Sequence, residues 1–322
     1  MKVKNIYVSI CLALLTLVSC QQDDVYTGPC SVNFRAYMQE ERVVSRANDG
    51  YADIDKTHAS FTAGLFVHTS NGTNDYVIPS TLMWNSETET LTTSLKLEQG
   101  NYTFYGYMPY SNDATFEANG RIMTLPGLAG MSASNAMVIK PVSKEIGNST
   151  TNIKVNLEMD HLMARVTPYF YINDASYDAL RKIKIKKVEF ILRNVNSYTA
   201  TVDYIKDEVI WTEGDAIANE VTFYETTNPV ELQLGKSNAI AHSTCYFCPE
   251  QSVDGLKMRV TYDVYDAKGN LTRLDAVAEN SIKKISGTLN EATNYKLYIP
   301  LVPSYLYALS DGDLDSNVLV IE

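Results

Sequence analysis

The sequence is poor in the residue types that metal sites, disulfide scaffolds and nucleic-acid surfaces need. Its 322 residues include five cysteines and four histidines, and its 27 Lys and Arg residues are outnumbered by 38 Asp and Glu residues. The formal net charge of −11 repels phosphate backbones, which excludes nucleic acid as a partner. No histidines show the H-x-H or H-E-x-x-H spacing of a zinc site. After residue 18, no apolar run approaches the length of a membrane-spanning helix.

The cysteines do not form a disulfide framework. Cys11 and Cys20 belong to the N-terminal segment, which leaves Cys30, Cys245 and Cys248, an odd number. Cys245 and Cys248 are three positions apart in a strand-like segment, so their thiols point to opposite faces, which suits neither a metal nor a redox pair. Because a nucleophile elbow and a phosphate-binding loop are also missing, we expect no enzymatic activity and no cofactor.

The N-terminal segment has the pattern of an export signal. Lys2 and Lys4 precede an almost unbroken apolar run, Ile6–Val18, which is too short to span a membrane but suits the core of a signal peptide. The run ends in Leu-Val-Ser before Cys20, which resembles the bacterial lipobox, in which the cysteine is acylated and becomes the new N-terminus. We therefore expect lipidation at Cys20 and attachment to the outer membrane at the cell surface. The alternative is an ordinary secretion signal in which this cysteine occurs by chance.

The remainder of the sequence predicts strands almost throughout. Apolar residues alternate with polar ones in short segments separated by turn residues, the pattern of β-sandwiches. The segments with this pattern are Val32–Ala36, Phe61–Val67, Ile153–Leu157, Leu162–Val166, Leu256–Val264 and Tyr295–Leu301. Tyr102–Tyr107 has aromatic residues on both faces instead, which predicts a strand covered on both sides. Ala175–Arg181 alone indicates a helix, of about two turns. The fold class is therefore all-β.

Loop-like composition predicts the domain organisation. Leu125–Gly130 and Gly147–Ser149 are rich in Gly, Pro, Ser and Asn, and a new set of strands begins after them. We expect a signal peptide at 1–19, a lipidated leader with the first strand at 20–50, an N-terminal β-sandwich at 51–158 and a C-terminal β-sandwich at 159–322.

Several motifs, taken in order, resemble the fimbrillin superfamily of Bacteroidetes. The superfamily comprises the subunits and anchors of pili that derive from lipoproteins, and the resemblance covers nearly the whole chain. After the lipobox, the motifs are Pro29-Cys30, Tyr-Gly-Tyr-Met-Pro-Tyr at 105–110, His-Leu-Met-Ala-Arg-Val at 161–166, Phe-Cys-Pro-Glu at 247–250 and Tyr-Leu-Tyr-Ala-Leu-Ser-Asp at 305–311.

The resemblance implies two transthyretin-like, Greek-key sandwich domains that assemble by strand donation. In stalk subunits of the superfamily, an arginine-specific protease removes the N-terminal strand and opens a groove for a strand of another subunit. Arg42 and Arg46 lie in a polar stretch that suits such a cut, although an ordinary surface linker has the same composition. The apolar segment Val318, Leu319, Val320 and Ile321 is either a last strand of its own domain or the donated strand. The short tail after residue 301 is reminiscent of anchor or accessory subunits.

Two charged segments have weaker functional interpretations. Asp311, Asp313 and Asp315 alternate as in a calcium loop, but Ser316 stands where an EF-hand needs glycine and no helices flank the segment. A solvated acidic turn therefore explains the pattern better than a metal site. Arg181–Lys187 alternates Lys with Ile, which predicts a strand with one charged face that is either solvated or matched to an acidic partner.

Two functions of different class fit these observations. The first is a structural subunit of a fimbria, of the anchor, accessory or tip type, which contacts other fimbrial subunits by strand exchange and contributes to adhesion. The second is a surface lipoprotein that does not polymerise and binds glycans or host ligands. The 22 tyrosines are compatible with both, since tyrosine stacks on sugars and is also a favoured strand residue.

Overall fold

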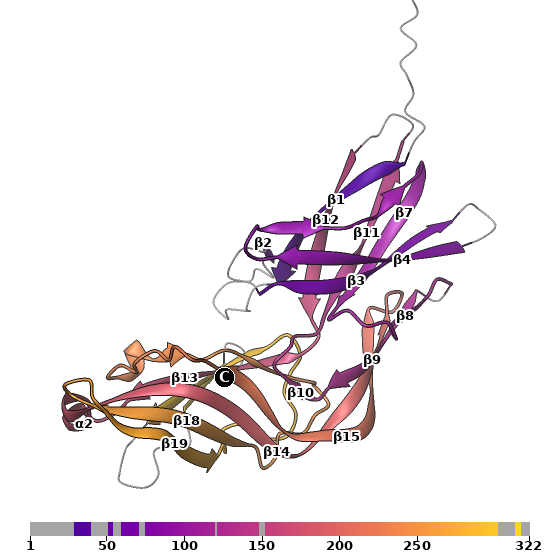
Figure 1. The fold of residues 1–322 in the computed structure, drawn as a ribbon. Helices are drawn as coiled ribbons and strands as arrows, with labels where there is room; N and C mark the ends of the chain where they lie inside the picture. The colour runs from indigo at the N-terminus through magenta and orange to yellow at the C-terminus, as the bar shows by residue number, and fades with distance from the viewer. Residues whose placement is uncertain are drawn as a thin grey trace, which may run out of the picture.

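The computed structural model describes residues 29–39, 51–53, 59–70, 75–119, 121–147, 152–301 and 313–316. Most of these residues are in strands, which form sandwich-like layers, and this confirms the all-β class (Figure 1). The strands are β1 (Cys30–Gln39), β2 (Tyr51–Asp53), β3 (Phe61–Ser70), β4 (Asp75–Asn85), β5 (Thr90–Thr92), β6 (Lys96–Leu97), β7 (Gly100–Met108), β8 (Thr115–Glu117), β9 (Ile122–Ala129), β10 (Met131–Ser132), β11 (Met137–Ile146), β12 (Asn152–His161), β13 (Ala164–Ile172), β14 (Arg181–Asp203), β15 (Glu208–Glu225), β16 (Ile240–Ala241), β17 (Cys245–Phe247), β18 (Lys257–Asp266), β19 (Leu271–Ser281), β20 (Asn294–Leu301) and β21 (Asp313–Ser316).

The predicted helix is confirmed as α2 (Ala175–Leu180). The carboxylate of Asp174 accepts hydrogen bonds from the backbone N–H groups of Ser176 and Tyr177, which satisfies two of the donors that a helix leaves free at its N-terminus. A single 3₁₀ turn, η1 (Lys236–Asn238), follows later in the chain.

The N-terminal lobe is one nine-stranded sheet that curls over its own core. Its strand order is β2-β1-β12-β11-β7-β3-β4-β5, and β6 pairs with β1 on the same edge as β2. The curl brings Phe34 of β1 against Phe104 of β7, with ring centroids 5.5 Å apart in an edge-to-face arrangement. Buried residues of β1, β3, β7, β11 and β12 share this core, so the lobe behaves as a sandwich although it is hydrogen-bonded as a single sheet.

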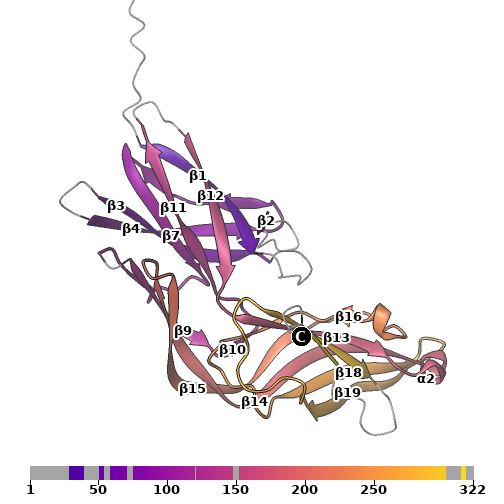
Figure 2. The ribbon, with the colours of Figure 1, turned by 180° about the vertical axis from the view of Figure 1, so that it is seen from behind.

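The C-terminal lobe consists of two six-stranded sheets that pack face to face. One sheet has the order β19-β18-β14-β9-β8 with β15 on the other edge of β14, and the second has the order β10-β17-β13-β20-β21 with β16 on β13. Between them lies the largest apolar cluster of the described residues, to which β13, β14, β17, β18 and β20 all contribute. Figures 1 and 2 show the two lobes meeting where β9 and β15 approach the N-terminal sheet.

A segment from the first half of the chain belongs to the sheet of the second. Strand β9 pairs with the last third of the 23-residue strand β14, and β10 pairs with β17. The loop predicted at 125–130 is wrong over most of its length, because β9 runs through it. Its Pro126 and Gly127 form a bulge opposite Thr199, between the pairs Tyr198–Leu128 and Ala200–Leu125. A bulge tolerates the missing N–H of proline, and Gly127 supplies the positive φ of 73°.

Aromatic side chains fill the junction between the lobes. Tyr105, on the outer face of the N-terminal sheet, contacts Phe116 of β8 and Tyr204 of the β14–β15 turn, with centroid distances of 4.5 and 4.9 Å. The hydroxyl of Tyr204 donates to the sulfur of Met123 at 3.8 Å, and burial raises the pKa of Tyr204 well above its ordinary value. The lobes therefore share a third apolar cluster, to which β3, β7, β9 and β14 contribute buried residues.

Buried Gln251 holds a bulged part of β14 in place. The side-chain oxygen of Gln251 accepts from the backbone N–H of Asn196 at 3.0 Å, and its amide nitrogen donates to the carbonyls of Asn194 and Ser252. The ladder of β14 with β15 shifts register around these positions, so Gln251 supplies partners that the ladder does not. Gly130 leaves room for this side chain, since a Cβ at Gly130 would overlap its oxygen.

His242 is enclosed in the C-terminal lobe as a neutral ring. It packs edge-to-face against Phe170 and Tyr224, at centroid distances of 5.2 and 4.9 Å. Its Nδ1 lies 2.9 Å from the carbonyl of Ile240, which assigns the proton to Nδ1, and its Nε2 has no hydrogen-bond partner among the described residues. Burial lowers the pKa of His242, because a second proton on Nε2 would be a buried charge without an acceptor.

We expect Gln251→Leu to lower the free energy of unfolding by about 1–3 kcal/mol, because the Asn196 N–H and the Asn194 carbonyl then lose their buried partner. Urea unfolding followed by circular dichroism measures this. The matched control is Gln233→Leu, at an exposed glutamine, which should stay within about 0.5 kcal/mol of wild type. Equal effects of the two substitutions would contradict the role given to Gln251.

Stability should fall as the pH drops through the ordinary histidine range because of His242. Its folded-state pKa is lowered, so the unfolded chain takes up a proton first, below about pH 6.5, and unfolding is favoured there. Urea midpoints between pH 7.5 and 5.5 should therefore decline more steeply for wild type than for His242→Phe, which keeps an aromatic ring but cannot titrate. Parallel declines would show that other groups cause the pH dependence.

Candidate functional site at the N-terminal strand

Strand β1 has one face in the core and one face in solvent. Cys30, Val32, Phe34 and Ala36 are buried, and the residues that alternate with them, Ser31, Asn33 and Arg35, are exposed. The alternation that predicts this strand over Val32–Ala36 is confirmed, and the strand itself extends to Gln39. The strand therefore contributes four side chains to the core of the N-terminal lobe while remaining close to the start of the described chain.

The pairing of β1 distinguishes it from its neighbours. It runs parallel to β12, in register from Ser31 opposite Asn152 to Met38 opposite Met159, whereas every other described pair in this sheet is antiparallel. Its second edge pairs only near the ends, with β6 at residues 30–31 and with β2 at residues 37–39. One side-chain hydrogen bond supplements the ladder, from Asn33 Nδ2 to Asn152 Oδ1 at 2.8 Å.

Loss of β1 would leave a groove with both polar and apolar character. The edge of β12 would present unpaired backbone groups, since β12 pairs with β1 along eight positions. Val155 and Leu157 of β12 and Phe104 of β7, which now lie against β1 in the core, would lose that cover. Such a groove fits an extended segment with alternating apolar side chains.

Several residues predicted as sites lie outside the described residues. These are Cys20, the candidate lipidation position; Arg42 and Arg46, the candidate cleavage positions; Asp311; and the terminal segment Val318, Leu319, Val320 and Ile321. Strand β1 ends at Gln39, three positions before Arg42. The lipidation, cleavage and strand-donation assignments stay predictions, as do the domain ranges.

Asp313 and Asp315 lie in β21, which pairs antiparallel with β20 from Tyr295 opposite Ser316 to Tyr298 opposite Asp313. In the parts of the chain that the structure describes, no three His, Cys, Asp or Glu residues gather as a metal site would require. The calcium assignment stays a weak prediction.

The charged face of Arg181–Lys187 is matched within the chain. Lys182 pairs with Asp178 at 3.1 Å and Glu231 at 3.7 Å, and Lys187 pairs with Glu189 at 2.7 Å. Ile183 and Ile185 are fully buried, as the alternation predicts. These lysines therefore need no acidic partner subunit to balance them.

Cys245 and Cys248 are both free and buried, in different apolar clusters. Burial raises the pKa of Cys248 to about 12 and that of Cys245 still further, so both thiols stay protonated and unreactive at neutral pH. The thiols point into separate cores, as their spacing predicts. Among the described residues, no helix is long and apolar enough to cross a membrane.

Comparisons with known proteins find similarity in fold. No protein-family model matches the chain, and no curated protein sequence matches it. A candidate cell adhesion protein from Bacteroides fragilis is similar in structure, with a TM-score of 0.50 and 11% identity over 90% of this chain and 97% of that one. A candidate cell adhesion protein from Bacteroides ovatus gives a TM-score of 0.48 and 12% identity over 90% and 98%. A fimbrial protein from Bacteroides vulgatus gives 0.42 and 12% over 89% and 99%.

At these identities the likeness concerns the fold alone. The fold similarity to the Bacteroides fragilis protein extends over nearly all of both chains, and it is consistent with the resemblance to the fimbrillin superfamily that the sequence motifs carry.

Proposed function

We propose that the chain is a cell-surface fimbrial or adhesion subunit, anchored through a lipid on Cys20, in which β1 occupies a site for a strand of another subunit. The observation that carries this proposal is the pairing of β1, a parallel strand near the start of the chain that fills a core groove and is followed closely by Arg42 and Arg46. The fold similarity to a candidate adhesion protein supports the same function.

The geometry of β1 suits replacement better than that of the strands around it. β11, β7 and β3 are each paired on both edges within the sheet, so removing any of them would split the lobe. Removal of β1 detaches only its short partners at β2 and β6 and leaves the order from β12 to β5 unbroken. An incoming strand would restore the backbone pairs of β12 and the burial of Phe104.

A surface lipoprotein that binds glycans without polymerising is the second candidate. Many of the tyrosines pack in the core and cannot stack on a ligand. The buried ones are Tyr102, Tyr105, Tyr107, Tyr171, Tyr198, Tyr262 and Tyr295. Among the described residues, Tyr76 and Tyr110 remain exposed. The tyrosine content therefore gives little support to the glycan-binding candidate. Whether the protein forms oligomers decides between the two candidate functions.

Cutting after Arg42 or Arg46 should convert the chain into a form that polymerises. We expect an arginine-specific protease to release the segment that contains β1 and to produce oligomers that resist SDS without boiling, because the filled groove is buried and fully hydrogen-bonded. The matched control is Arg42→Lys/Arg46→Lys, which keeps both charges but removes the cleavage sites. A ladder that forms equally well in this variant would contradict cleavage at these positions.

Deletion of residues 317–322 tests the C-terminal segment as the donor in the same gel assay. A ladder that is lost on deletion supports donation by Val318–Ile321, and an unchanged ladder excludes it. Absence of any ladder from cut wild-type protein would favour the binding lipoprotein.

The mature N-terminus should be an acylated Cys20 in an anchor or tip subunit. Mass spectrometry of the protein from its own membrane would then show an N-terminal peptide that carries lipid and begins at Cys20, and Cys20→Ala would abolish both the lipid and the membrane attachment. A start at Val43 or Ala47 would instead identify a processed stalk subunit. An unmodified N-terminus before residue 20 would exclude the lipoprotein assignment.

A further inference from the structure

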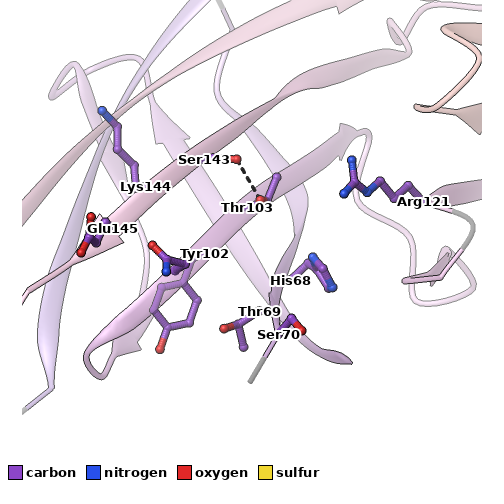
Figure 3. Close-up of a pocket in the computed structure, with 10 residues that line it drawn as sticks. His68, Thr69, Ser70, Tyr102, Thr103, Arg121, Ser143, Lys144 and Glu145 are labelled. Atoms are coloured by element: carbon purple, nitrogen blue, oxygen red, sulfur yellow. Dashed lines mark hydrogen bonds between the residues drawn. The ribbon is translucent and has the colours of Figure 1, made fainter. Parts of the chain in front are cut away.

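A polar cavity of about 310 Å³ lies on the outer face of the N-terminal sheet, away from β1 (Figure 3). Strands β3, β7 and β11 form its floor, and Arg121, from the turn between β8 and β9, forms its wall. Its volume is near the lower end of the roughly 300–1,000 Å³ typical of small-molecule sites. The cavity therefore fits a ligand of about the size of one sugar ring.

The floor is built from hydroxyl and amide side chains that the sheet register brings together. Thr103 of β7 stands opposite His68 of β3 on one side and Ser143 of β11 on the other. The hydroxyls of Thr103 and Ser143 are 2.9 Å apart and share a hydrogen bond. Asn101 lies two positions before Thr103, so its side chain is on the same face. Each hydroxyl donates and accepts, which matches the hydroxyls of a saccharide.

Arg121 is a cation without a carboxylate partner in the described part of the chain. His68 Nε2, on the floor, lies 3.1 Å from Oδ1 of Asp75, which is not among the residues that line the cavity. Figure 3 shows Arg121 and His68 on one side of the Thr103–Ser143 hydrogen bond, and Lys144 and Glu145, of opposite charge, on the other. On the side where Arg121 stands, the lining of the cavity contains no carboxylate.

The backbone fixes Arg121 in this position. Arg121 has a positive φ of 49°, and its carbonyl accepts from the backbone N–H of Tyr204 at 3.1 Å. Tyr204 is the residue that packs between the lobes against Tyr105. The turn that carries Arg121 is therefore held by the other lobe, and this backbone contact places the exposed residue beside the floor.

We propose that this cavity binds an acidic sugar, whose carboxylate pairs with Arg121 and whose ring hydroxyls bond to Thr103, Ser143 and Asn101. A guanidinium presents a planar fork that matches a carboxylate through two parallel hydrogen bonds. A neutral sugar would leave the charge of Arg121 unmatched, and a simple carboxylate would leave the hydroxyl floor unused. The inference does not depend on strand exchange, because β1 contributes nothing to the cavity.

Isothermal titration of the full chain with trigalacturonate, of which one ring would occupy the cavity, tests the proposal. The matched ligand is its trimethyl ester, which keeps the ring hydroxyls but has no charge, and we expect it to bind at least tenfold more weakly, about 1.4 kcal/mol. Arg121→Gln should weaken trigalacturonate binding by a similar factor, and Thr103→Val should weaken both ligands. Arg273→Gln removes the same charge from an exposed position of β19 and should leave the affinity unchanged.

Three results would overturn the inference. They are the absence of saturable binding by trigalacturonate, equal affinity of Arg121→Gln and wild type, and equal affinity for acetate and trigalacturonate. Unchanged urea midpoints of the variants establish that they fold. Because none of these measurements involves cleavage or oligomers, their failure leaves the strand-exchange proposal standing, and the reverse also holds.

Discussion

The hydrogen-bonded pairing of β9 with the end of β14 is the constraint on which the rest of the structure depends. It takes a segment from between two strands of the N-terminal sheet, β7 and β11, and places it in the sheet of the C-terminal lobe. Because β14 continues through 23 residues, the same strand is paired by β18 in its first half and by β9 near its end. The two lobes are therefore connected in two ways: the chain passes from one to the other, and strands from both halves of the chain pair within one sheet.

This joining explains features that are otherwise unrelated. The aromatic cluster around Tyr105 forms because β8 and the β14–β15 turn lie against the outer face of the N-terminal sheet. Gln251 is needed because β14 departs from regular pairing where it passes from one set of partners to the next. Arg121 reaches the polar floor because its turn belongs to the same inserted hairpin.

Local patterns in the sequence predict where strands and the helix lie, but they do not predict which strands pair with one another. Leu256–Val264 and Ala175–Arg181 are identified by alternation and by helical composition, because those signals depend on residues near one another in the chain. Leu125–Gly130 is misassigned because Pro126 and Gly127 indicate a turn, and only the opposing strand β14 makes them a bulge. The polar cavity is invisible in the sequence for the same reason: Thr103, Ser143 and Arg121 match no motif and meet only through register and topology.

The parallel orientation of β1 determines how the molecule responds to tension. A pull on the chain before Pro29 acts along the axis of β1 and slides it past β12, so the ladder from Ser31 to Met38 is loaded all at once. In this direction the bonds share the force, whereas a pull at right angles to the strand would break them one after another. A strand that resists shear along its length and yields when peeled from one end can hold under load in one direction and still be exchanged in another.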